Sequence, residues 1–352
     1  MAIYYYANQV YQLSYALPFY NKIGGKFIVN SISKYWRFKK HLQSLAAYNE
    51  NTFLKTPSII IRKNGQMQDL EGIILSFSND WIYRNPKKCK IIFHEHGASD
   101  KHIGSNSKAK TVEKLKNFDY IFLMSPKNLI KLNALNANLD ENNFVKIYNM
   151  RFANYDSMVP ERAKILTNLK IKDPTKKIVL YAPTWRFGNG TLRKYFHRFA
   201  KEITQEYNLI VRPHFHEAKL IPQYRIWAKL HNIKNLYFSN PSNLAKHDTM
   251  TDFVASDILL SDTSAVLYEY LVSQKPIIII NPNYDKRVEM PAEMDIMKNS
   301  VIFNETDNIN QVIAQTLKEQ KYSKNYNKMF ADCFYVPSQT DVKNAISFLK
   351  EI

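Results

Sequence analysis

Residues 257–270 read Asp-Ile-Leu-Leu-Ser-Asp-Thr-Ser-Ala-Val-Leu-Tyr-Glu-Tyr. The apolar run Ile258–Ser261 is typical of a buried strand, and it leads directly into the helical pattern of residues 265–274. A strand that passes into a helix in this way is half of a βαβ unit, from which parallel sheets are built. Ligands of such sheets bind at the carboxyl ends of the strands, so the polar residues between strand and helix are candidates for a binding site.

The same alternation of short β-branched runs and longer amphipathic stretches extends over the whole chain and predicts the α/β class. Strands are predicted in the first half at residues 27–30, 58–62, 72–77, 90–94, 120–124 and 144–148. They are predicted in the second half at residues 177–182, 208–212, 236–238, 258–261, 276–281 and 301–303. Helices are predicted at residues 34–48, 107–117, 193–206, 265–274, 309–319 and 341–350. A polar stretch over residues 149–177 separates the halves and predicts two domains with a ligand cleft between them.

The composition limits the classes of protein to which the chain can belong. Of the 352 residues, 45% are hydrophobic, which excludes a disordered chain. Lys and Arg number 49 against 31 Asp and Glu, and this excess favours an anionic partner such as a phosphorylated substrate, phospholipid head groups or nucleic acid. No RNP-like or helix-turn-helix pattern occurs, so we expect no nucleic-acid partner, and a nucleic-acid-binding protein is the weaker, non-enzymatic alternative.

Cysteine content and hydropathy indicate the compartment. The two cysteines, Cys89 and Cys333, exclude a disulfide framework and favour a reducing environment. The first residues do not have the pattern of a secretory signal, and no apolar run is long enough to span a bilayer. We therefore expect a cytoplasmic protein that is soluble or peripheral on a membrane.

The first candidate segment follows the strand predicted at residues 90–94 and reads His-Glu-His-Gly-Ala-Ser-Asp-Lys-His-Ile-Gly over residues 94–104. So many ionisable groups directly after a buried strand favour a functional loop over a merely polar one. His94 and His96 share one face of an extended segment, as a metal pair would. We nevertheless expect no metal, because no further His or Cys residues are spaced to complete the ligand set.

Two further segments follow strands in the second half. Thr184, Trp185 and Arg186 come after the strand at residues 177–182, where an indole and a guanidinium suit a ligand; an interdomain contact explains them equally well. Arg212 and His214 end the strand at residues 208–212, and this pair suits a phosphate-binding site, although a surface loop explains it almost as well.

Ser261, Asp262, Thr263 and Ser264 form the fourth segment. Hydroxyls and backbone N–H groups before a helix bind phosphate, whereas ordinary N-capping needs one such residue and contributes about 1 kcal/mol. The chain has no Asp-x-Asp pair, which is the usual carboxylate clamp for a divalent metal on a nucleotide diphosphate. We therefore expect a metal-independent site without a cofactor, in which Arg, Lys and His neutralise the substrate.

Taken in order, these segments resemble the motifs of the CDP-glycerol glycerophosphotransferase family, the polymerases and primases of teichoic acid and of related phosphopolyol capsules. The family's His-Gly-x-x-x-Lys-x-x-Gly element resembles residues 96–104, and its Tyr-Ala-Pro-Thr-Trp-Arg element is matched at residues 181–186. Its Arg-x-His element is matched at residues 212–214, and its Ser/Thr-Asp-Tyr-Ser-Ser element, followed by Lys-Pro, resembles residues 261–265 and 275–276. Glu95 and Thr263 depart from the Trp and Tyr of the family.

The resemblance implies a GT-B fold with two Rossmann-like domains facing across a cleft. Residues 1–155 would form an acceptor domain, residues 156–335 a nucleotide-donor domain, and residues 336–352 a helix that crosses back to the first domain. The implied reaction transfers a polyol phosphate, glycerol phosphate in the first instance, from a CDP-activated donor to a hydroxyl of a cell-surface glycan or lipid-linked acceptor, and releases CMP. The alternative is a GT-B glycosyltransferase or sugar-phosphate transferase of capsule or lipopolysaccharide biosynthesis with another nucleotide-activated donor.

The resemblance also implies roles for the site residues. His96 would be the general base, and His214 with Arg212 would stabilise the pyrophosphate and the departing CMP. The remaining candidates for binding the substrate and donor are Gly97, Lys101, Thr184, Trp185, Arg186, Ser261, Asp262, Thr263 and Ser264.

A lipid-linked acceptor implies peripheral contact with the anionic inner face of the plasma membrane. The first 40 residues are rich in aromatic and basic side chains, which suits such a surface. These side chains are Tyr4, Tyr5, Tyr6, Tyr11, Tyr15, Phe19, Tyr20, Lys22, Lys26, Lys34, Arg37, Lys39 and Lys40. The competing explanation is that the aromatic residues pack inside the first domain and that the lysines are merely solvated.

Overall fold

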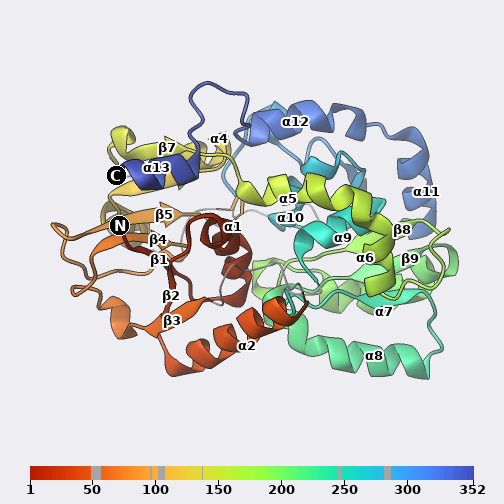
Figure 1. The fold of residues 1–352 in the computed structure, drawn as a ribbon. Coiled ribbons are helices and arrows are strands. Elements are labelled where there is room, and N and C mark those ends of the chain that lie inside the picture. Colours follow the sequence, from red (N-terminus) through yellow and green to blue (C-terminus); the bar gives the residue numbers. More distant parts are fainter. Residues whose placement is uncertain (49–56, 96, 102–107, 137, 245–246, 281–286) are drawn as a thin grey trace. The chain divides into compact units, whose positions relative to one another are not determined.

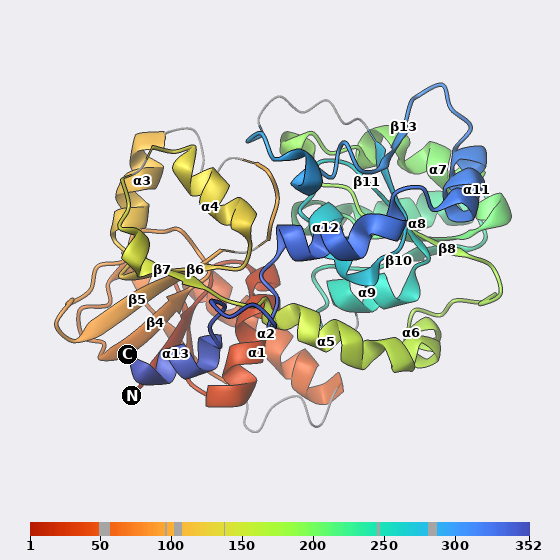
Figure 2. The same cartoon turned by 90° about the horizontal axis from the view of Figure 1, so that it is seen from above.

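The computed structural model describes residues 1–48, 57–95, 97–101, 108–136, 138–244, 247–280 and 287–352. The chain forms two compact units, each built around one sheet (Figure 1, Figure 2). Unit 1 consists of Met1–Arg151 and Cys333–Ile352, and unit 2 consists of Phe152–Asp332. Every strand pair described in the two sheets is parallel, and helices alternate with the strands, so the predicted α/β class is confirmed.

Unit 1 contains a seven-stranded sheet in the order β3-β2-β1-β4-β5-β6-β7. Its strands are β1 (Ile3–Tyr6), β2 (Lys26–Val29), β3 (Ser58–Ile61), β4 (Gly72–Ser76), β5 (Cys89–His94), β6 (Tyr120–Leu123) and β7 (Phe144–Lys146). Its helices are α1 (Leu13–Ile23), α2 (Ile32–Tyr48), α3 (Lys108–Lys116), α4 (Pro126–Asn133) and α13 (Ala345–Glu351), and α5 (Met150–Met158) begins at its boundary with unit 2. The strand order reverses between β1 and β4, because the chain adds β2 and β3 on one side of β1 and the later strands on the other.

The sequence analysis missed β1. Its residues, Ile-Tyr-Tyr-Tyr, do not alternate between apolar and polar, and the sequence leaves open whether the tyrosines face a membrane or pack inside the first domain. In the structure Tyr5 and Tyr6 are buried in the sheet, and Tyr15, Phe19 and Tyr20 of α1 are buried as well. Of the two explanations, packing inside the first domain is therefore confirmed for these five aromatic side chains, which form part of the core of unit 1.

Unit 2 contains a six-stranded sheet in the order β10-β9-β8-β11-β12-β13. Its strands are β8 (Ile178–Tyr181), β9 (Asn208–Val211), β10 (Leu236–Phe238), β11 (Ile258–Ser261), β12 (Ile277–Ile280) and β13 (Val301–Phe303). Its helices are α6 (Arg162–Asn168), α7 (Leu192–Glu206), α8 (Ile221–Leu230), α9 (Thr249–Ala255), α10 (Val266–Glu269), α11 (Ile309–Glu319) and α12 (Tyr326–Cys333). The strand order reverses between β8 and β11, so their carboxyl ends border a topological switch point.

The central strands of unit 2 are apolar on both faces. All residues of β8, β11 and β12 are buried, and β12 consists of four isoleucines. Such continuous β-branched runs are expected where helices cover both faces of a parallel sheet. Along α7, Leu192, Tyr195, Phe196, Phe199 and Ile203 are buried at helical spacing and form the face that packs into this core.

The helix predicted at residues 265–274 is shorter than expected. Only α10 is α-helical, and a 3-10 turn over Tyr270–Ser273 follows it. Gln274 ends the turn in the left-handed conformation at φ 56°, and Pro276 then begins the approach to β12. A four-residue α-helix has a smaller dipole at its N-terminus than the ten-residue helix that the sequence predicts would have.

The last residues of the chain belong to unit 1 and contact its sheet. The helix predicted at residues 341–350 is α13, and the ring of Phe348 lies with its centroid 5.2 Å from that of Tyr120. Before α13, the backbone N–H of Lys343 donates to the carbonyl of Lys146 at 2.8 Å, next to β7. Among the residues that the structure describes, no helix is long and apolar enough to cross a membrane.

Candidate functional site

The carboxyl ends of three neighbouring strands define the candidate site of unit 2. Strands β9, β8 and β11 lie side by side in the sheet. The residues that follow them are the predicted ones: Thr184, Trp185 and Arg186 after β8, Arg212 and His214 after β9, and residues 261–264 at the end of β11. The fold thus brings three separate sequence segments together at the switch point of one sheet.

Asp262 connects the end of β11 to the loop that follows β8. Its side chain is fully buried, and its Oδ1 accepts a hydrogen bond from the backbone N–H of Thr184 at 2.8 Å. Its Oδ2 accepts from the backbone N–H and from the hydroxyl of Thr191, both at 2.9 Å. Hydrogen bonds to a buried carboxylate are charge-assisted and strong, so this residue fixes the shape of the loop.

The neighbours of Asp262 hold the same loop. The hydroxyl of Ser261 donates to the carbonyl of Ala182 at 2.6 Å, and the hydroxyl of Thr263 donates to the carbonyl of Gly188 at 2.9 Å. Ser261 and Thr263 are both buried. Ser264, in contrast, is partly exposed, and its hydroxyl accepts from the N–H of Val266 at 3.3 Å. Of this segment, Ser264 is thus the residue whose side chain lies nearest to solvent.

The loop is packed so closely that one position requires glycine. A Cβ on Gly190 would lie 2.2 Å from the carbonyl oxygen of Thr184 and 2.6 Å from the carbonyl carbon of Trp185. Both neighbours are backbone atoms, which cannot move aside as a flexible side chain would. The backbone of residues 184–190 therefore folds back on itself, and within it Trp185 is partly exposed and Arg186 is exposed.

An aromatic–imidazole cluster, Trp185, Phe187, His214 and His216, lies at the ends of β8 and β9. Trp185 stacks on His214 with ring centroids 6.1 Å apart and planes at 25°, and it lies 5.1 Å from His216 and 5.2 Å from Phe187. Phe187 is 77% exposed, and the guanidinium of Arg186 lies 5.5 Å from its ring. Exposed rings beside a cation suit a ligand that combines a planar group with negative charge.

His214 has a defined orientation in this cluster. Its Nδ1 accepts a hydrogen bond from the backbone N–H of His216 at 3.3 Å. A neutral imidazole that accepts at Nδ1 carries its proton on Nε2, so this ring is a hydrogen-bond donor through Nε2. A donor of this kind can stabilise negative charge that develops on a phosphate oxygen.

The guanidinium of Arg212 forms its hydrogen bonds with residues of unit 2. The buried guanidinium donates to the hydroxyl of Ser239 at 2.8 Å, to the carbonyl of His247 at 2.9 Å and to Oδ2 of Asp252 at 2.8 Å, and it also donates to the hydroxyl of Thr249 at 3.0 Å. Burial raises the pKa of Asp252, while the charge of Arg212 acts in the opposite direction. Arg212 thus ties the end of β9 to the end of β10 and to α9, and it positions the loop that carries His214.

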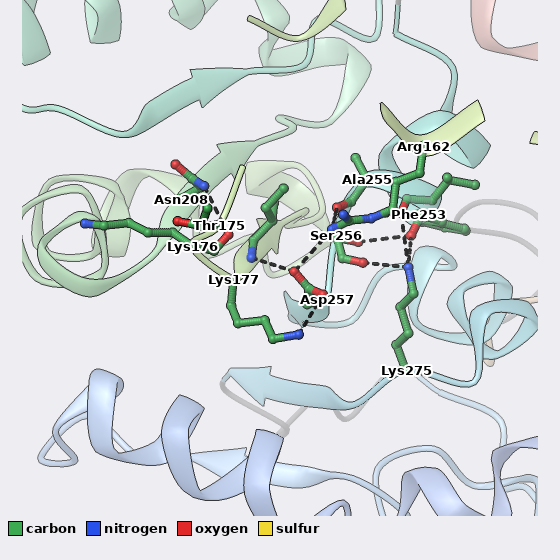
Figure 3. A network of polar contacts seen from close by, with 12 residues as sticks. Arg162, Thr175, Lys176, Lys177, Asn208, Phe253, Ala255, Ser256, Asp257 and Lys275 are labelled. Carbon is green, nitrogen blue, oxygen red and sulfur yellow. Dashed lines mark hydrogen bonds and ion pairs between the residues drawn. The ribbon is translucent and has the colours of Figure 1, made fainter. Parts of the chain in front are cut away.

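A different polar network lies at the amino-terminal ends of the strands in the same sheet (Figure 3). Asp257, just before β11, accepts from the backbone N–H of Ile178 at 2.8 Å. Lys177 and Arg162 each place a side-chain nitrogen 3.4 Å from its carboxylate. This network joins the starts of β8 and β11, so it stabilises the sheet at the strand ends that are remote from the candidate site.

Lys275, from the Lys-Pro element, closes the C-terminal end of α9 (Figure 3). Its ammonium donates to the carbonyls of Phe253 at 2.8 Å, Val254 at 3.2 Å and Ser256 at 2.6 Å. A cation at the last carbonyls of a helix is favourable, but burial lowers the pKa of Lys275 to about 8. Lys275 is therefore a structural residue and does not face the switch point.

In unit 1, His94 belongs to the core. The ring is buried, with Phe77 at 4.9 Å and Phe19 at 5.6 Å between centroids, and its Nδ1 lies 2.9 Å from the carbonyl oxygen of Glu95. A metal pair of His94 with His96 is disfavoured, because the first ring is enclosed by aromatic side chains. His96, the predicted general base, lies outside the described residues.

Glu95 is part of a buried ion pair that sequence reasoning missed. Its Oε1 lies 2.7 Å from Nζ of Lys131 on α4, and its Oε2 accepts from the side-chain amide of Asn128. Lys131 is buried, so the pair holds the loop after β5 against α4. The only sequence signal was that Lys127 and Lys131 share one helix face with apolar residues.

Gly97 and Lys101 follow in the same loop. Gly97 has φ 96°, a conformation that favours glycine, and Lys101 is partly exposed. Within the described part of the chain, no group of three or more His, Cys, Asp or Glu side chains is placed to hold a metal ion.

The sequence of the chain matches a family model but no curated protein. The family model described as CDP-Glycerol:Poly(glycerophosphate) glycerophosphotransferase matches residues 29–346. A search of curated proteins found no significant match.

Among solved structures, the wall teichoic acid polymerase TagF superposes with a TM-score of 0.67 at 17% identity over 99% of this chain and 87% of that chain. UDP-GlcNAc 2-epimerase from Neisseria meningitidis, bound to UDP-GlcNAc, superposes with a TM-score of 0.59 at 11% identity over 100% of this chain and 99% of that chain. A putative UDP-N-acetylglucosamine 2-epimerase from Listeria monocytogenes reaches 0.55 at 12% identity over 94% and 91% of the two chains. These matches support the predicted GT-B fold with two Rossmann-like domains.

Proposed function

Because the chain belongs to the CDP-glycerol:poly(glycerophosphate) glycerophosphotransferase family, it is an enzyme, and we propose that it transfers glycerol phosphate from CDP-glycerol to an acceptor hydroxyl and releases CMP. The acceptor in this proposal is a cell-surface glycan or a lipid-linked precursor of one. Capsule or teichoic acid assembly is the process that such a transfer would serve.

The observation that carries the proposal is the arrangement at the switch point of unit 2. Trp185 and His214 present stacked rings beside the exposed guanidinium of Arg186. A cytosine base suits the rings, and a diphosphate suits the cation and the Nε2–H of His214. Asp262 supports this arrangement indirectly, because it fixes the loop that carries Trp185.

The proposed step is an in-line transfer at the glycerol-linked phosphorus of the donor. The acceptor oxygen forms a new bond to this phosphorus, and the bond from phosphorus to the oxygen that bridges to CMP breaks. His96 accepts the proton of the acceptor hydroxyl, and His214 donates a hydrogen bond to the phosphate of the departing CMP. Lys101 and Arg186 add positive charge near the phosphates, while Arg212 positions the loop of His214.

The test measures CMP release from CDP-glycerol and CDP-ribitol in EDTA, with a lipid-linked disaccharide acceptor. Acceptor-dependent release that survives EDTA, and that falls at least 100-fold in His96→Ala and His214→Ala, is the expected result, since acid–base groups contribute about 10²–10⁴-fold. His231→Ala is the matched control, because His231 is exposed directly after α8. Full activity of either site variant contradicts the assigned role.

A second candidate is a GT-B enzyme that uses a nucleotide sugar. The structural similarity to UDP-GlcNAc 2-epimerases favours it as the alternative, since those proteins share the fold. A donor screen decides between the two: turnover of a UDP-sugar without CMP release from either CDP-polyol would replace the first proposal.

Peripheral membrane contact is part of the proposal, and α2 is the element that supports it. Ile32 and Trp36 are 56% and 60% exposed, and Nζ of Lys39 lies 5.1 Å from the Trp36 ring. The helix has Lys34, Arg37, Lys39 and Lys40 but no acidic residue. An amphipathic surface of this kind binds anionic membranes.

Co-sedimentation with phosphatidylglycerol vesicles tests this contact. We expect binding at low salt that is lost at high salt and reduced in Trp36→Ala. Trp81→Ala, at a less exposed tryptophan of the same unit, is the control. Equal binding by the two variants would exclude α2 as the contact.

A further inference from the structure

A buried carboxylate that the sequence analysis did not identify lies close to the candidate site of unit 2. Glu217 comes three residues after His214, in the 3-10 helix Phe215–Leu220 that follows β9. Its side chain is 5% exposed, although the preceding residue, His216, is exposed. Because carboxylates are rarely buried in proteins unless a partner holds them, we looked for the contact that keeps this one inside.

The partner of Glu217 is Arg193 in the first turn of α7. Nε of Arg193 donates to Oε1 of Glu217 at 3.1 Å. The side chain of Arg193 is 50% exposed, so the ion pair extends from solvent into the interior of unit 2. α7 begins at Leu192, directly after the loop that carries Trp185. The ion pair therefore connects the segment that follows β8 to the segment that follows β9.

The backbone couples Glu217 to His214. The N–H of Glu217 donates to the carbonyl of His214 at 2.8 Å, and the N–H of His216 donates to Nδ1 of the same residue at 3.3 Å. His214 is the N-cap of the 3-10 helix, so this one turn fixes both its carbonyl and its ring. A displacement of Glu217 would reach the ring of His214 through these two hydrogen bonds.

The stack of Trp185 on His214 depends on the positions of both segments. Trp185 belongs to the segment after β8 and His214 to the segment after β9, and their ring centroids lie 6.1 Å apart with planes at 25°. The pairing of β8 with β9 ends before either residue, so the sheet alone does not fix the distance between the rings. The ion pair of Arg193 with Glu217 connects the two segments beyond the end of this pairing.

The unequal burial of the two partners decides how the ion pair is tested. Removal of Arg193 alone would leave the Glu217 carboxylate buried without its partner, which is strongly destabilising. Removal of Glu217 alone would leave a half-exposed guanidinium, which water can hydrate. Glu217→Ala is therefore the variant that breaks the connection with the smaller effect on folding.

We propose that Glu217 and Arg193 are positioning residues, which hold the ring of His214 against Trp185. This inference rests on the proposed function, in which the two rings bind the nucleotide and His214 stabilises the departing CMP. Neither Glu217 nor Arg193 touches the substrate, and both act through the position of His214. Because a misplacement of about 1 Å can cost about 100-fold in rate, an ion pair outside the reacting groups affects catalysis in this way.

The kinetic test measures kcat and KM in Glu217→Ala, with CDP-glycerol and the acceptor varied in turn. We expect kcat/KM for CDP-glycerol to fall about 10- to 100-fold and the KM for the acceptor to remain unchanged, because the stacked rings contact CDP-glycerol. Glu217→Gln should keep most of the activity, since its amide oxygen can still accept from Nε of Arg193. Glu202→Ala is the matched control, because it removes the same side chain from an ion pair with Nε of Arg198 within α7. A kcat/KM in Glu217→Ala equal to that of the wild type would overturn the inference.

The double variant Arg193→Ala/Glu217→Ala tests whether the two residues act as a pair. It lacks the unpaired buried carboxylate that Arg193→Ala alone would leave. If both residues position His214 through their mutual contact, the double variant should have the same kcat/KM for CDP-glycerol as Glu217→Ala. A loss equal to the product of the two single effects would show independent roles and contradict the inference.

Fluorine NMR of the protein labelled with 5-fluorotryptophan separates this inference from the proposed function, because it needs no substrate. The chain has four tryptophans, and Trp185→Phe identifies the resonance of Trp185. We expect this resonance to shift in Glu217→Ala and to stay in place in Glu202→Ala. The resonance of Trp227 reports whether unit 2 is folded, since its ring packs on Phe196.

The two proposals fail in different ways. An unshifted Trp185 resonance in Glu217→Ala would overturn the positioning role even if the wild type turns over CDP-glycerol. A shifted resonance together with no turnover of CDP-glycerol by the wild type would overturn the proposed function alone.

Discussion

Asp262 shows how a single buried carboxylate can organise a binding loop. It accepts three hydrogen bonds from Thr184 and Thr191, and Ser261 and Thr263 add two more contacts to the same loop. The side chains of Ser261, Asp262 and Thr263, which the sequence predicts to bind the substrate and donor, are therefore used to hold the loop. The sequence shows that they follow a strand, but it does not show which partners their polar atoms find.

Asp262→Asn tests this role. The amide would place an N–H group against the N–H of Thr184 or Thr191, so we expect the free energy of unfolding to fall by about 1.5–3 kcal/mol. Urea denaturation followed by circular dichroism measures the change. Glu305→Gln, at an exposed ion pair with Lys194, should change it by less than about 1 kcal/mol, and an equal loss in both variants would contradict the argument.

Lys275 predicts a pH dependence of stability. Because burial lowers its pKa to about 8 from 10.5, the unfolded chain binds a proton between these pH values that the folded protein has released. The free energy of unfolding of the wild type should therefore rise relative to that of Lys275→Met as the pH increases from about 8 to 10. Denaturation of both proteins at pH 7, 8, 9 and 10 measures this trend. Lys229→Met serves as an exposed control, and a constant or falling difference would refute the prediction.

At the scale of elements, periodicity located most strands well because buried parallel strands are continuous β-branched runs. β10, β11 and β13 have the predicted boundaries, and β12 was recognised from its isoleucines. β1 was missed because consecutive tyrosines are compatible with a strand, a core helix or a membrane surface. The neighbouring strands β2 and β4 decide which of these structures is formed, and they begin 20 and 66 residues after the end of β1.

The packing of α13 on the sheet of unit 1 gives a prediction at this scale. Phe348 is buried with its ring against Tyr120 and Phe122, so Phe348→Ala should destabilise unit 1 by about 3–5 kcal/mol. Hydrogen–deuterium exchange should speed up at β6 and β7 and remain unchanged at β8, β11 and β12. Phe187→Ala, at an exposed ring of unit 2, should change neither set of amides.

At the scale of the whole molecule, the sequence predicted two α/β halves and the strand ends that carry the candidate residues. It did not predict the hydrogen bonds of Tyr6 and Asn8 with Asp80, because Asp80 lies 74 and 72 positions further along the chain and shares no motif with them. It also did not predict that Arg212 is enclosed by Ser239 and Asp252. Both features depend on how segments that are distant in the sequence meet at the ends of the strands. Residue patterns along the sequence do not show these contacts.

The two thiols make the stability of unit 1 measurable within the whole protein. Cys89 and Cys333 are both buried in unit 1, and burial raises the pKa of Cys89 to about 11. We expect Ellman's reagent to modify neither thiol in the native protein and both after unfolding of unit 1. Phe348→Ala should shift the urea midpoint of modification downward, whereas Lys275→Met should not. Rapid modification of the native protein would show that the burial of these thiols is incomplete.

The interruption of unit 1 by unit 2 has a consequence for biosynthesis. After translating Met1–Arg151, a ribosome must add all of Phe152–Asp332 before it reaches the segment whose Lys343 pairs beside β7. At typical rates of about 5–20 residues per second, this delay lasts on the order of 10–40 s. Throughout that time the nascent chain carries an open sheet edge, which is prone to pair with other chains. The yield at high expression would then be limited by the supply of chaperones that hold the growing polypeptide. The stability of the finished protein would limit it less.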